Sequence, residues 1–397
     1  MTDRSWAGRS LTVEIGQVAH GGHCVARHEG RVLFVRHALP GERVRVVVTE
    51  DRGGSFARAD AVEVLTPSKA RVSPPCRYAG PGRCGGCGWP HAAPAAQREL
   101  KAFVVREQLQ RLARLDVDVV VEAVEPAPLH WRTRMQYAVR DGVVGLRAHR
   151  SHEVIDIDGC LIAVPDADVS VARPALRSAA RSIELESGDA GGPTVSVVDG
   201  RGRRQVVSGG PQRHRVRNRS FEVSSGGFWQ VHERAADVLA DTVLAMAGAR
   251  PGESIVDLFC GVGLFTAFLG EQVGAGGRVR GYEGAASAVR DGVRNVADLP
   301  QCRITRAAID ARTVQGIDGL ADVVVLDPPR TGAKKAVVEA ICDLSPRAVV
   351  YVACDPAALA RDVASFAARG WRLEQLRAFD LFPMTHHVEC VALLLPG

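Results

Sequence analysis

Residues Ser254–Phe265 read SIVDLFCGVGLF, and this stretch indicates the fold of the C-terminal half of the chain. A strand-like apolar run ends in a Gly-x-Gly turn, and a helical pattern follows. Glycines at such a turn let the backbone approach a ligand closely at the carboxyl edge of a parallel sheet. The third glycine of a full dinucleotide-binding fingerprint is missing, so the stretch alone also fits an ordinary strand–turn–helix unit.

Apolar strand-like runs alternate with helical patterns from about Gly226 to the C-terminus. This alternation predicts an α/β domain with a doubly wound parallel sheet. A short connection joins the last two predicted strands, which we expect to form an antiparallel hairpin at the end of the sheet. The predicted strands are Ser254–Phe259, Arg278–Glu283, Cys302–Arg306, Asp322–Leu326, Arg347–Ala353, Trp371–Phe379 and His387–Leu395.

Two acidic residues strengthen the prediction of a ligand crevice. Glu283 ends the strand after the glycine turn, where a carboxylate can accept hydrogen bonds from ribose hydroxyls. Asp327 ends a later strand, in the run LDPPRTG. Because strand ends on both sides of a switch point face one crevice, we predict a nucleoside-containing cofactor there. The Asp-Pro-Pro run and the terminal hairpin resemble class I methyltransferases, which favours a methyl donor over a dinucleotide.

Cys354 lies in the run VVYVACDPAALARD and ends the fifth predicted strand of this half. A helix is expected to begin at Pro356, since proline is favoured at the first helical position. A thiolate at a helix N-terminus is stabilised by the helix dipole, so Cys354 is a candidate nucleophile. A small residue buried in the core fits the same position.

Glu389 lies in HHVECVALLL, a strand that is otherwise apolar after its histidines. A lone carboxylate is unfavourable to bury unless it is paired or functional. Burial would raise the pKa of Glu389 and make it a useful base. The alternatives are pairing with His386 or His387, or an outward-facing edge position.

A cysteine and a base are the minimum set for methylation of carbon 5 of uracil. A thiolate that adds to carbon 6 produces an enolate, which can attack a methyl donor through carbon 5. A base must then remove the proton from carbon 5 so that the thiolate can leave. Cys354 and Glu389 supply these two groups, and the target base would have to be flipped out of its stack.

Residues 1–66 are predicted to form a small β-barrel of oligonucleotide-binding (OB) type. Short strands at even spacing, separated by glycine-rich turns, support this prediction. The predicted strands, all within residues 9–66, are Leu11–Val18, Val25–His28, Arg31–Val35, Glu42–Val48 and Ala57–Leu65. Prolines that mark the end of the barrel are Pro67, Pro74 and Pro75.

Residues 67–225 are predicted to form an irregular central domain, and residues 226–397 the catalytic domain. An amphipathic helix is expected at Ala95–Leu115, and part of 91–124 is expected to pack on the catalytic domain. The strand-like runs in the central domain are Arg134–Arg140, Val143–Arg147 and Glu153–Ile157.

Four cysteines of the central domain form a candidate metal site. Cys76, Cys84 and Cys87 lie close together, and Cys160 follows far downstream. Four soft thiolates suit either an iron–sulfur cluster or tetrahedral zinc. The remaining cysteines outside the catalytic motif are interpreted as core or neutral positions: Cys24, Cys260, Cys302, Cys342 and Cys390.

Charge and composition indicate a cytoplasmic protein with a nucleic-acid partner. The formal net charge is +5, and arginines cluster at two places, where they could line an RNA groove or simply form a solvated surface. We see no apolar run of about 18 residues and no signal peptide in the polar start Met1–Ser10, and we expect no membrane contact and a monomer. The clusters are Arg27, Arg31, Arg36, Arg43, Arg45, Arg52 and Arg58, and Arg201, Arg203, Arg204, Arg213, Arg215, Arg217 and Arg219.

The runs VACDPAALARD, LDPPRTGA, FWQVH, DLFCGVGLF and HHVEC resemble the RNA 5-methyluridine (uracil-5-) methyltransferases. The closest likeness is to the 23S rRNA branch, which carries an N-terminal TRAM domain and an iron–sulfur cluster. The resemblance covers nearly the whole chain. It implies a Rossmann-like class I methyltransferase domain, a TRAM-type OB barrel and a central iron–sulfur α+β domain.

The resemblance also implies an activity and its residues. The expected reaction is S-adenosylmethionine-dependent methylation of carbon 5 of a specific uridine, in 23S rRNA first and in tRNA as the alternative, through a covalent adduct between cysteine and carbon 6. Cys354 is implied as nucleophile and Glu389 as general base. Gln230, Phe259, Glu283 and Asp327 are implied around S-adenosylmethionine. A 4Fe–4S cluster with a structural role, in preference to zinc, is implied at Cys76, Cys84, Cys87 and Cys160.

The sequence departs from the family pattern at three places. The usual Cys-Asn-Pro has Asp355 in the middle here, which adds a negative charge beside the nucleophile. A donor contact often supplied by asparagine falls at Leu264. The contact after the third strand falls near Ala308 or Asp310.

Two other classes of protein compete with this reading. RNA cytosine-5 methyltransferases typically use two cysteines, and no second cysteine lies near the Asp-Pro-Pro run, whereas amino-group methyltransferases need no cysteine nucleophile. A non-catalytic RNA-binding module would rely on the barrel and the arginine clusters alone. The presence of both Cys354 and Glu389 argues against that module.

Overall fold

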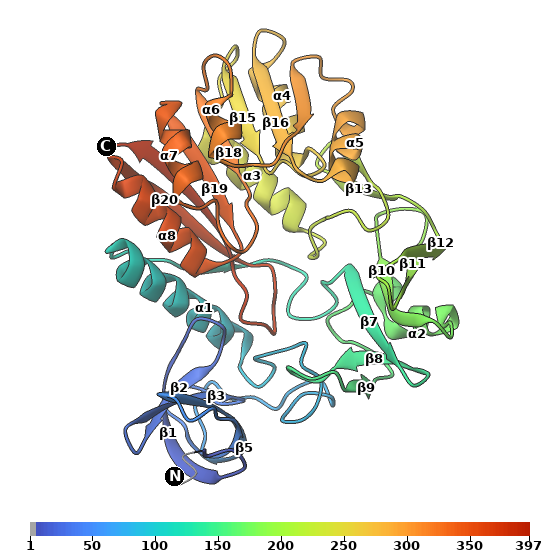
Figure 1. Cartoon of the computed structure of the whole chain (residues 1–397), viewed down its shortest axis with the longest axis vertical. Helices are drawn as coiled ribbons and strands as arrows, with labels where there is room; N and C mark the ends of the chain where they lie inside the picture. Colours follow the sequence, from blue (N-terminus) through green and yellow to red (C-terminus); the bar gives the residue numbers. More distant parts are fainter. Residues whose placement is uncertain (1–4) are drawn as a thin grey trace.

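The computed structural model describes residues 5–397, so the first four residues of the predicted 1–66 barrel and of the polar start Met1–Ser10 lie outside the described residues. Three parts are visible in Figure 1: a barrel at the N-terminal end, a large sheet covered by helices at the C-terminal end, and a second sheet beside them. No helix within residues 5–397 is long and apolar enough to cross a bilayer.

The barrel closes in the order β1-β2-β3-β5-β4. Leu11, Val13 and Ile15 of β1 point inward and alternate with exposed residues, which is the period of a strand with one buried face. The predicted strands are confirmed to within two residues at each end. They are β1 (Ser10–Val18), β2 (Cys24–His28), β3 (Arg31–Arg36), β4 (Arg43–Glu50) and β5 (Phe56–Thr66).

The central part contains a six-stranded antiparallel sheet with the order β12-β11-β10-β7-β8-β9. The prediction that this part is largely irregular is therefore wrong for residues 180–223, where exposed arginines and glycines hide the alternation of the strands. The strands are β7 (Arg134–Arg140), β8 (Val143–Arg147), β9 (Val154–Asp156), β10 (Ala180–Glu186), β11 (Thr194–Asp199) and β12 (Arg204–Ser208), followed by the hairpin β13 (Gln212–Val216) and β14 (Arg219–Val223). Short helical turns are η2 (Pro165–Ala167), α2 (Val169–Ala172) and η3 (Arg173–Ala175).

The C-terminal part is an eight-stranded sheet with the order β17-β16-β15-β18-β19-β21-β20-β6. The first five strands in this order run parallel to one another, and the strand order reverses between β15 and β18. The strands are β15 (Ser254–Leu258), β16 (Arg278–Glu283), β17 (Cys302–Arg306), β18 (Val323–Leu326), β19 (Ala348–Ala353), β20 (Trp371–Asp380), β21 (Glu389–Pro396) and β6 (Val121–Ala123). The helices are α3 (Ala235–Ala247), α4 (Leu264–Val273), α5 (Ala286–Asn295), α6 (Ala311–Gln315), α7 (Lys335–Asp343) and α8 (Pro356–Ala367).

The predicted antiparallel hairpin is present as β20 and β21, but it does not lie at the end of the sheet. Strand β6 pairs in parallel with β20, with Val121 opposite Ala378. A strand of three residues is too short to show a period in the sequence, which is why the prediction of the sheet edge was wrong.

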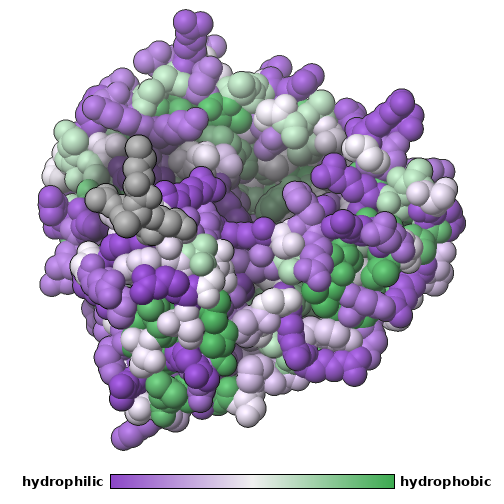
Figure 2. Space-filling view, turned by 60° about the horizontal axis from the view of Figure 1, so that its bottom comes forward, coloured by the Kyte–Doolittle hydropathy of each residue, from purple (hydrophilic) through white to green (hydrophobic). Residues whose placement is uncertain are grey.

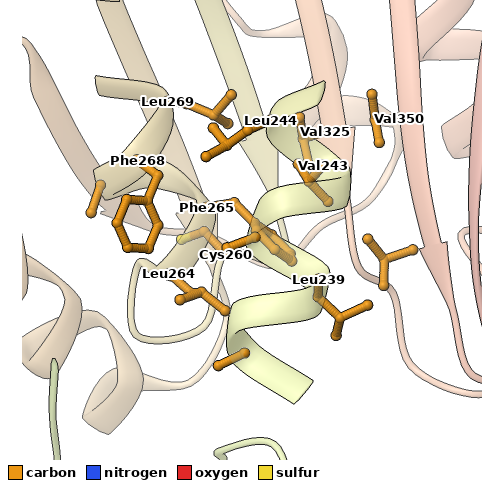
Figure 3. Close-up of a cluster of buried hydrophobic side chains, with 14 of the residues drawn as sticks. Leu239, Val243, Leu244, Cys260, Leu264, Phe265, Phe268, Leu269, Val325 and Val350 are labelled. Carbon is orange, nitrogen blue, oxygen red and sulfur yellow. The ribbon is translucent and has the colours of Figure 1, made fainter. Parts of the chain in front are cut away.

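Helices cover both faces of this sheet, and its central strands are buried throughout. Figure 3 shows one face, where Leu239 and Val243 of α3 meet Phe265 and Phe268 of α4 above Val325 of β18. The opposite face packs against α7, α8 and a helix from before the central sheet, α1 (Pro94–Gln108), which continues into the π-turn η1 (Leu109–Ala113). Because apolar contact is unbroken on both sides, the sheet is a rigid platform for the residues at its edge.

Candidate active site

Three chemically active side chains meet at the carboxyl edge of the large sheet. Asp327 follows β18, and Cys354 follows the neighbouring strand β19. Strand β21 runs antiparallel to β19 and begins with Glu389, and the register pairs Ala353 with Cys390. Strand register therefore brings Asp327, Cys354 and Glu389 to one place.

Glu389 is buried, with 3% of its surface exposed. Burial raises the pKa of Glu389 well above its ordinary value, and the neighbouring Asp327 carboxylate raises it further, whereas Arg330 opposes the shift. The proposed outward-facing position is wrong. Within residues 5–397, Glu389 forms no hydrogen bond or ion pair with His386 or His387.

Cys354 is half-buried in the same surroundings. Burial, followed by the charges of Glu389 and Asp327, raises the pKa of its thiol to about 12, and Asp355 adds to the shift. Arg330 again acts in the opposite direction. The thiol is therefore protonated in the free protein, and positive charge near it is what would activate it.

A cavity of about 110 Å³ lies beside Cys354. Its walls come from two parts of the molecule: the turn His20–Gly22 of the barrel and, from the catalytic domain, Arg330, Cys354 and the pair His386 and His387. The face drawn in Figure 2 is largely hydrophilic and is hollowed near its centre. The cavity thus opens to a polar ligand that touches both barrel and sheet.

The loop after Asp327 is held by a residue that the sequence did not reveal as important. Asp362 of α8 accepts hydrogen bonds from the Ala333 N–H at 2.7 Å and the Tyr351 hydroxyl at 2.7 Å. The Tyr351 hydroxyl in turn accepts from the Ala333 N–H at 3.1 Å. The last residue of the run VACDPAALARD therefore fixes the loop that carries Arg330.

Phe259, Glu283 and Asp327 follow or end β15, β16 and β18, which are neighbours in the sheet. Phe259 is half-buried and has a φ of 61°, a rare backbone conformation that is typical of functional turns. The Glu283 carboxylate accepts from the N–H groups of Gly261 at 3.1 Å and Ala285 at 2.7 Å. The predicted cofactor residues from the sheet thus line one crevice at its switch point.

Asp257 lies directly beneath this crevice and is fully buried. It accepts a hydrogen bond from the Thr266 hydroxyl at 2.6 Å, while its other oxygen has no partner in the described part of the chain. Burial raises the pKa of Asp257 to about 7, and Glu283 contributes to the shift. The sequence shows Asp257 as the acidic residue near the end of β15, but the prediction assigned this residue no role in the site.

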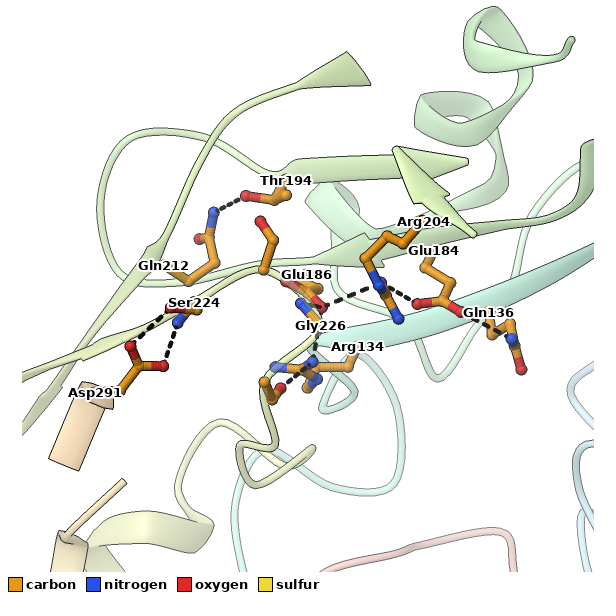
Figure 4. A network of polar contacts seen from close by, with 12 residues as sticks. Arg134, Gln136, Glu184, Glu186, Thr194, Arg204, Gln212, Ser224, Gly226 and Asp291 are labelled. Carbon is orange, nitrogen blue, oxygen red and sulfur yellow. Dashed lines mark hydrogen bonds and ion pairs between the residues drawn. The ribbon is translucent and has the colours of Figure 1, made fainter. Parts of the chain in front are cut away.

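Gln230 lies in the segment between β14 and α3, and a polar network fixes the start of that segment (Figure 4). Glu186 of the central sheet accepts from the Gly226 N–H at 2.8 Å and from Arg134 at 2.8 Å. Arg134 also donates to the carbonyl of Gly227 at 2.7 Å. The Gln230 amide itself has no hydrogen-bond partner among residues 5–397, so it is available to a ligand.

Two of the departures from the family pattern can be placed. Leu264 is buried in the first turn of α4 and carries no polar group. Asp310 accepts from the Thr313 N–H at 2.9 Å and caps α6, while the Ala308 carbonyl accepts from the Thr313 hydroxyl at 2.6 Å. The Asp310 side chain therefore has a structural partner already.

Cys76, Cys84, Cys87 and Cys160 line one cavity of about 250 Å³. Burial raises the pKa of Cys87, and the thiols of the other three add to the shift in the order Cys160, Cys84 and Cys76. Over residues 5–397, however, no three His, Cys, Asp or Glu side chains are arranged so that they could hold a metal ion. The structure brings the four cysteines around a common space without closing them on a centre.

Most arginines of the two clusters are paired with carboxylates. Representative pairs are Arg31 with Asp51, Arg58 with Glu50, Arg203 with Asp199, Arg217 with Asp241 and Arg219 with Asp298. These clusters are thus better described as charge-balanced surfaces than as bare cationic grooves.

Comparisons with known proteins identify the family. Residues 213–396 match the model of the tRNA (uracil-5-)-methyltransferases, and residues 4–62 match the TRAM domain. An uncharacterized RNA methyltransferase of Streptomyces avermitilis is 47% identical over 98% of this chain and 99% of its own length. One from Streptomyces coelicolor is 46% identical over 99% of this chain and 94% of its own.

A solved structure shows the same fold over nearly the whole chain. The Pyrococcus abyssi tRNA (uracil-54, C5)-methyltransferase in complex with S-adenosyl-L-homocysteine aligns with a TM-score of 0.72 and 22% identity, covering 97% of this chain and 100% of its own. The chain therefore belongs to the RNA methyltransferase family of these relatives: it is an S-adenosylmethionine-dependent RNA methyltransferase with a tRNA (uracil-5-)-methyltransferase domain over residues 213–396 and an N-terminal TRAM domain.

Proposed function

We propose that the enzyme methylates carbon 5 of a specific uridine in 23S rRNA through a covalent adduct between Cys354 and carbon 6 of the base. The observation that supports this most strongly is the meeting of Cys354, Asp327 and Glu389 at adjacent strand ends. A nucleophile and a base close to one another at adjacent strand ends are what the reaction at carbon 5 requires.

Each residue then has a defined task. As the thiolate, the Cys354 sulfur forms a bond to carbon 6, and the π electron pair between carbons 5 and 6 moves toward carbon 5 and the carbon 4 carbonyl oxygen as an enolate, so that carbon 5 becomes nucleophilic. Once carbon 5 carries the methyl group, Glu389 removes the carbon 5 proton, and the electron pair expels the Cys354 thiolate. The positive charge of Arg330 lowers the pKa of both Cys354 and Glu389 and so favours the reactive forms.

S-adenosylmethionine, when bound, supplies an electrophilic methyl group on a positively charged sulfur. The residues of the crevice fit it, because they combine an unpartnered amide with carboxylates at the switch point of the sheet. Gln230 and Asp327 would face the amino-acid part and the sulfonium, Phe259 would pack against the nucleoside, and Glu283 would accept from the ribose hydroxyls.

A 4Fe–4S cluster is proposed at Cys76, Cys84, Cys87 and Cys160. The donor set suits it, and the Gly86 N–H donates to the Cys84 sulfur at 3.5 Å, a contact typical of cluster-bound thiolates. The cavity of these cysteines is also lined by Met384, five residues before Glu389. The cluster would therefore order the segment that leads to the base, and the alternative metal is zinc.

The three parts divide the work in this proposal. Residues 1–66 would bind RNA, residues 67–225 would hold the cluster and guide the substrate, and residues 226–397 would carry out the chemistry. The choice of 23S rRNA rests on the likeness to the cluster-containing branch, and tRNA, the substrate named for the family model and for the Pyrococcus enzyme, is the second candidate. The cysteines among residues 5–397 form no disulfide bonds, which fits the proposed cytoplasmic location. The proposed oligomeric state is a monomer.

The proposal is tested with anaerobically purified protein, S-adenosylmethionine and unmodified transcripts of 23S rRNA and tRNA. Nucleoside mass spectrometry of each digested RNA measures 5-methyluridine. We expect the product in 23S rRNA. Product in tRNA alone would replace the target but keep the reaction, whereas methylation of cytidine or of an amino group would overturn the reaction itself.

Two variants separate the roles of the nucleophile and the base. Cys354→Ser should form no covalent complex with RNA and no product, while Glu389→Gln should accumulate a methylated protein–RNA adduct that survives denaturing electrophoresis. Cys302→Ser, a half-buried cysteine on β17, is the matched control and should behave as the unaltered enzyme. Full turnover by Cys354→Ser would rule out the adduct.

A further inference from the structure

The turn between β1 and β2 of the barrel reaches the catalytic domain beside the nucleophile. Nε2 of His20 lies 3.0 Å from Oδ2 of Asp355, to which it donates a hydrogen bond. The carbonyl of Gly22 accepts from the indole N–H of Trp89 at 2.9 Å, and a Cβ atom at Gly22 would approach the side chain of His386 to 2.5 Å. The turn thus contacts its surroundings at three points, and the pair of His20 with Asp355 is the one that joins two polar side chains.

Asp355 has two partners besides its place in the chain next to Cys354. Its Oδ1 accepts from the Ala358 N–H at 2.8 Å and caps α8, which leaves Oδ2 for His20. Burial alone would raise the pKa of Asp355, but the hydrogen bonds from His20 and Ala358 outweigh it, and the pKa is lowered. Asp355 is therefore a carboxylate at neutral pH, held in place by the barrel on one side and the helix on the other.

The Asp355 carboxylate makes ionisation of the neighbouring Cys354 thiol less favourable. Its charge is among the causes that raise the pKa of Cys354. The family pattern has a neutral asparagine at this position. This chain therefore carries a negative charge beside the nucleophile that the pattern lacks. The only imidazole that bonds to Asp355 within residues 5–397 is that of His20.

We propose that His20 is a positioning residue for the methyl-transfer reaction: by pairing with Asp355 it offsets the negative charge beside Cys354, and it thereby links the seating of the RNA-binding barrel to the reactivity of the nucleophile. This rests on the proposed role of Cys354. The charged and titratable groups that face Cys354 or the His20–Asp355 pair from the packed elements are Asp327, Arg330, Arg361, His386, His387, Glu389 and Cys390.

The competing explanation is that the pair only clamps two domains together. The two explanations differ in a double-mutant cycle. If His20 acts through the charge of Asp355, its removal matters when residue 355 is aspartate and is without effect when it is asparagine. A clamp that merely seats the barrel would be weakened by loss of His20 in either background.

The measurement is the rate at which iodoacetamide alkylates Cys354 in the full-length protein without RNA. Peptide mass spectrometry separates this site from the other cysteines, and the rate is measured near neutral pH for every protein. The proteins are the unaltered chain, His20→Ala, His20→Gln, Asp355→Asn and His20→Ala/Asp355→Asn. His152→Ala, an exposed histidine away from the cavity, is the control.

We expect His20→Ala to slow alkylation about three- to tenfold, which corresponds to a rise of up to about one unit in the thiol pKa. His20→Gln keeps a hydrogen-bond donor but no positive charge, and its rate should fall between those of the unaltered chain and His20→Ala. Asp355→Asn and the double variant should be alike and at least as fast as the unaltered chain. His152→Ala should match the unaltered chain.

An unchanged rate in folded His20→Ala, or an equal loss in the Asp355→Asn background, would overturn the proposal. Thermal unfolding of each variant shows whether His20→Ala is folded, and His20→Gln gives a second reading if it is not. The readout is independent of methylation. Coupling between His20 and Asp355 together with a fully active Cys354→Ser would therefore refute the role of Cys354 and leave the pair itself established.

Discussion

The carboxyl edge of the catalytic sheet and the cysteine-rich segment before α1 organise reactive side chains in opposite ways. At the sheet edge, Cys354 and Glu389 are placed by the hydrogen-bond register of strands whose faces are buried. Around Cys76, Cys84 and Cys87 there is almost no regular structure, and the segment is tied to its surroundings by isolated contacts such as Trp89 N–H to the Met384 carbonyl at 2.9 Å. The first site is made by the fold, whereas the second, under the cluster proposed above, would need its ligand to be complete.

The two sites should differ in how much stability the protein loses when their reactive side chains are removed. A site fixed by strand register should survive the loss of its reactive side chains, because the strands are held by their backbone and core. A site fixed by ligation should lose its structure with its ligands. The following four predictions test this difference, from the largest expected effect to the smallest.

Cys84→Ser should lower the free energy of unfolding by about 5 kcal/mol, because loss of a cluster ligand removes the organising centre of the segment. Urea unfolding of anaerobic protein measures this, and iron and sulfide analysis should give about four iron atoms per chain before the change and few after it. Cys354→Ser, at the sheet edge, should shift the transition by less than about 1 kcal/mol. Equal shifts in both variants would contradict the contrast drawn here.

Lys101→Met should destabilise the protein by about 3–4 kcal/mol, because it leaves the buried Asp380 carboxylate without its partner. Lys101 of α1 is fully buried and donates to Asp380 and to the Phe382 carbonyl at 3.0 Å. Chemical unfolding should show that Lys101→Met/Asp380→Leu recovers most of this loss. No recovery in the double variant would mean that packing, and not the unpaired charge, dominates.

Asp257→Asn should become more favourable relative to the unaltered protein as the pH rises. The pKa of Asp257 is raised by burial to about 7 in the folded state from 3.8. Below pH 3.8 the carboxyl is protonated in both the folded and the unfolded state, so its ionisation does not affect stability. Above about pH 7 it is ionised in both states, and the folded state carries the full penalty of a buried charge. Between pH 5 and pH 8 the difference in unfolding free energy should change by about 2–3 kcal/mol.

Urea titrations of both proteins at the two pH values measure this change, in the absence of S-adenosylmethionine. Asp141→Asn, exposed in the turn between β7 and β8, is the control for the loss of a surface carboxylate. A flat response for Asp257→Asn would show that the carboxyl is not held neutral beneath the crevice.

Gly22→Ala should lose about 1 kcal/mol more stability than Gly21→Ala. Both glycines have positive φ, 82° and 91°, so both variants carry the same kind of backbone strain. Only at Gly22 would the new Cβ collide with His386, whereas nothing lies within 4 Å at Gly21. Differential scanning calorimetry should therefore separate the two, and identical transitions would mean that the turn is not seated against the catalytic domain.

The sequence predicted the parts in which periodicity is strong. The barrel strands and the parallel strands around Ser254–Leu258 alternate or run apolar without interruption, and their ends place Asp327 and Cys354 by chain order alone. Strands β10 to β14 were missed because their exposed faces carry arginine and their turns carry glycine. Such segments have no core of their own to reveal them.

The neighbours of the reactive groups were beyond prediction for a different reason. His20 is separated from Asp355 by 335 positions, and no local pattern connects them. Asp362 was visible only as the end of a helical motif, although its contact with Ala333 holds the Asp-Pro-Pro loop. Residues that act on the nucleophile through another part of the molecule require the tertiary structure.

Strand β6 affects how the large sheet assembles during synthesis of the chain. Glu122, the middle residue of this strand, pairs with Arg377 of β20, 255 positions later in the chain. During synthesis, edge strand β6 is therefore made long before β20, the strand with which it pairs. Until β6 pairs with it, β20 has an unpaired edge. A fragment consisting of residues 226–397 would keep that edge permanently bare, so we expect it to aggregate during expression unless residues 94–124 are supplied with it.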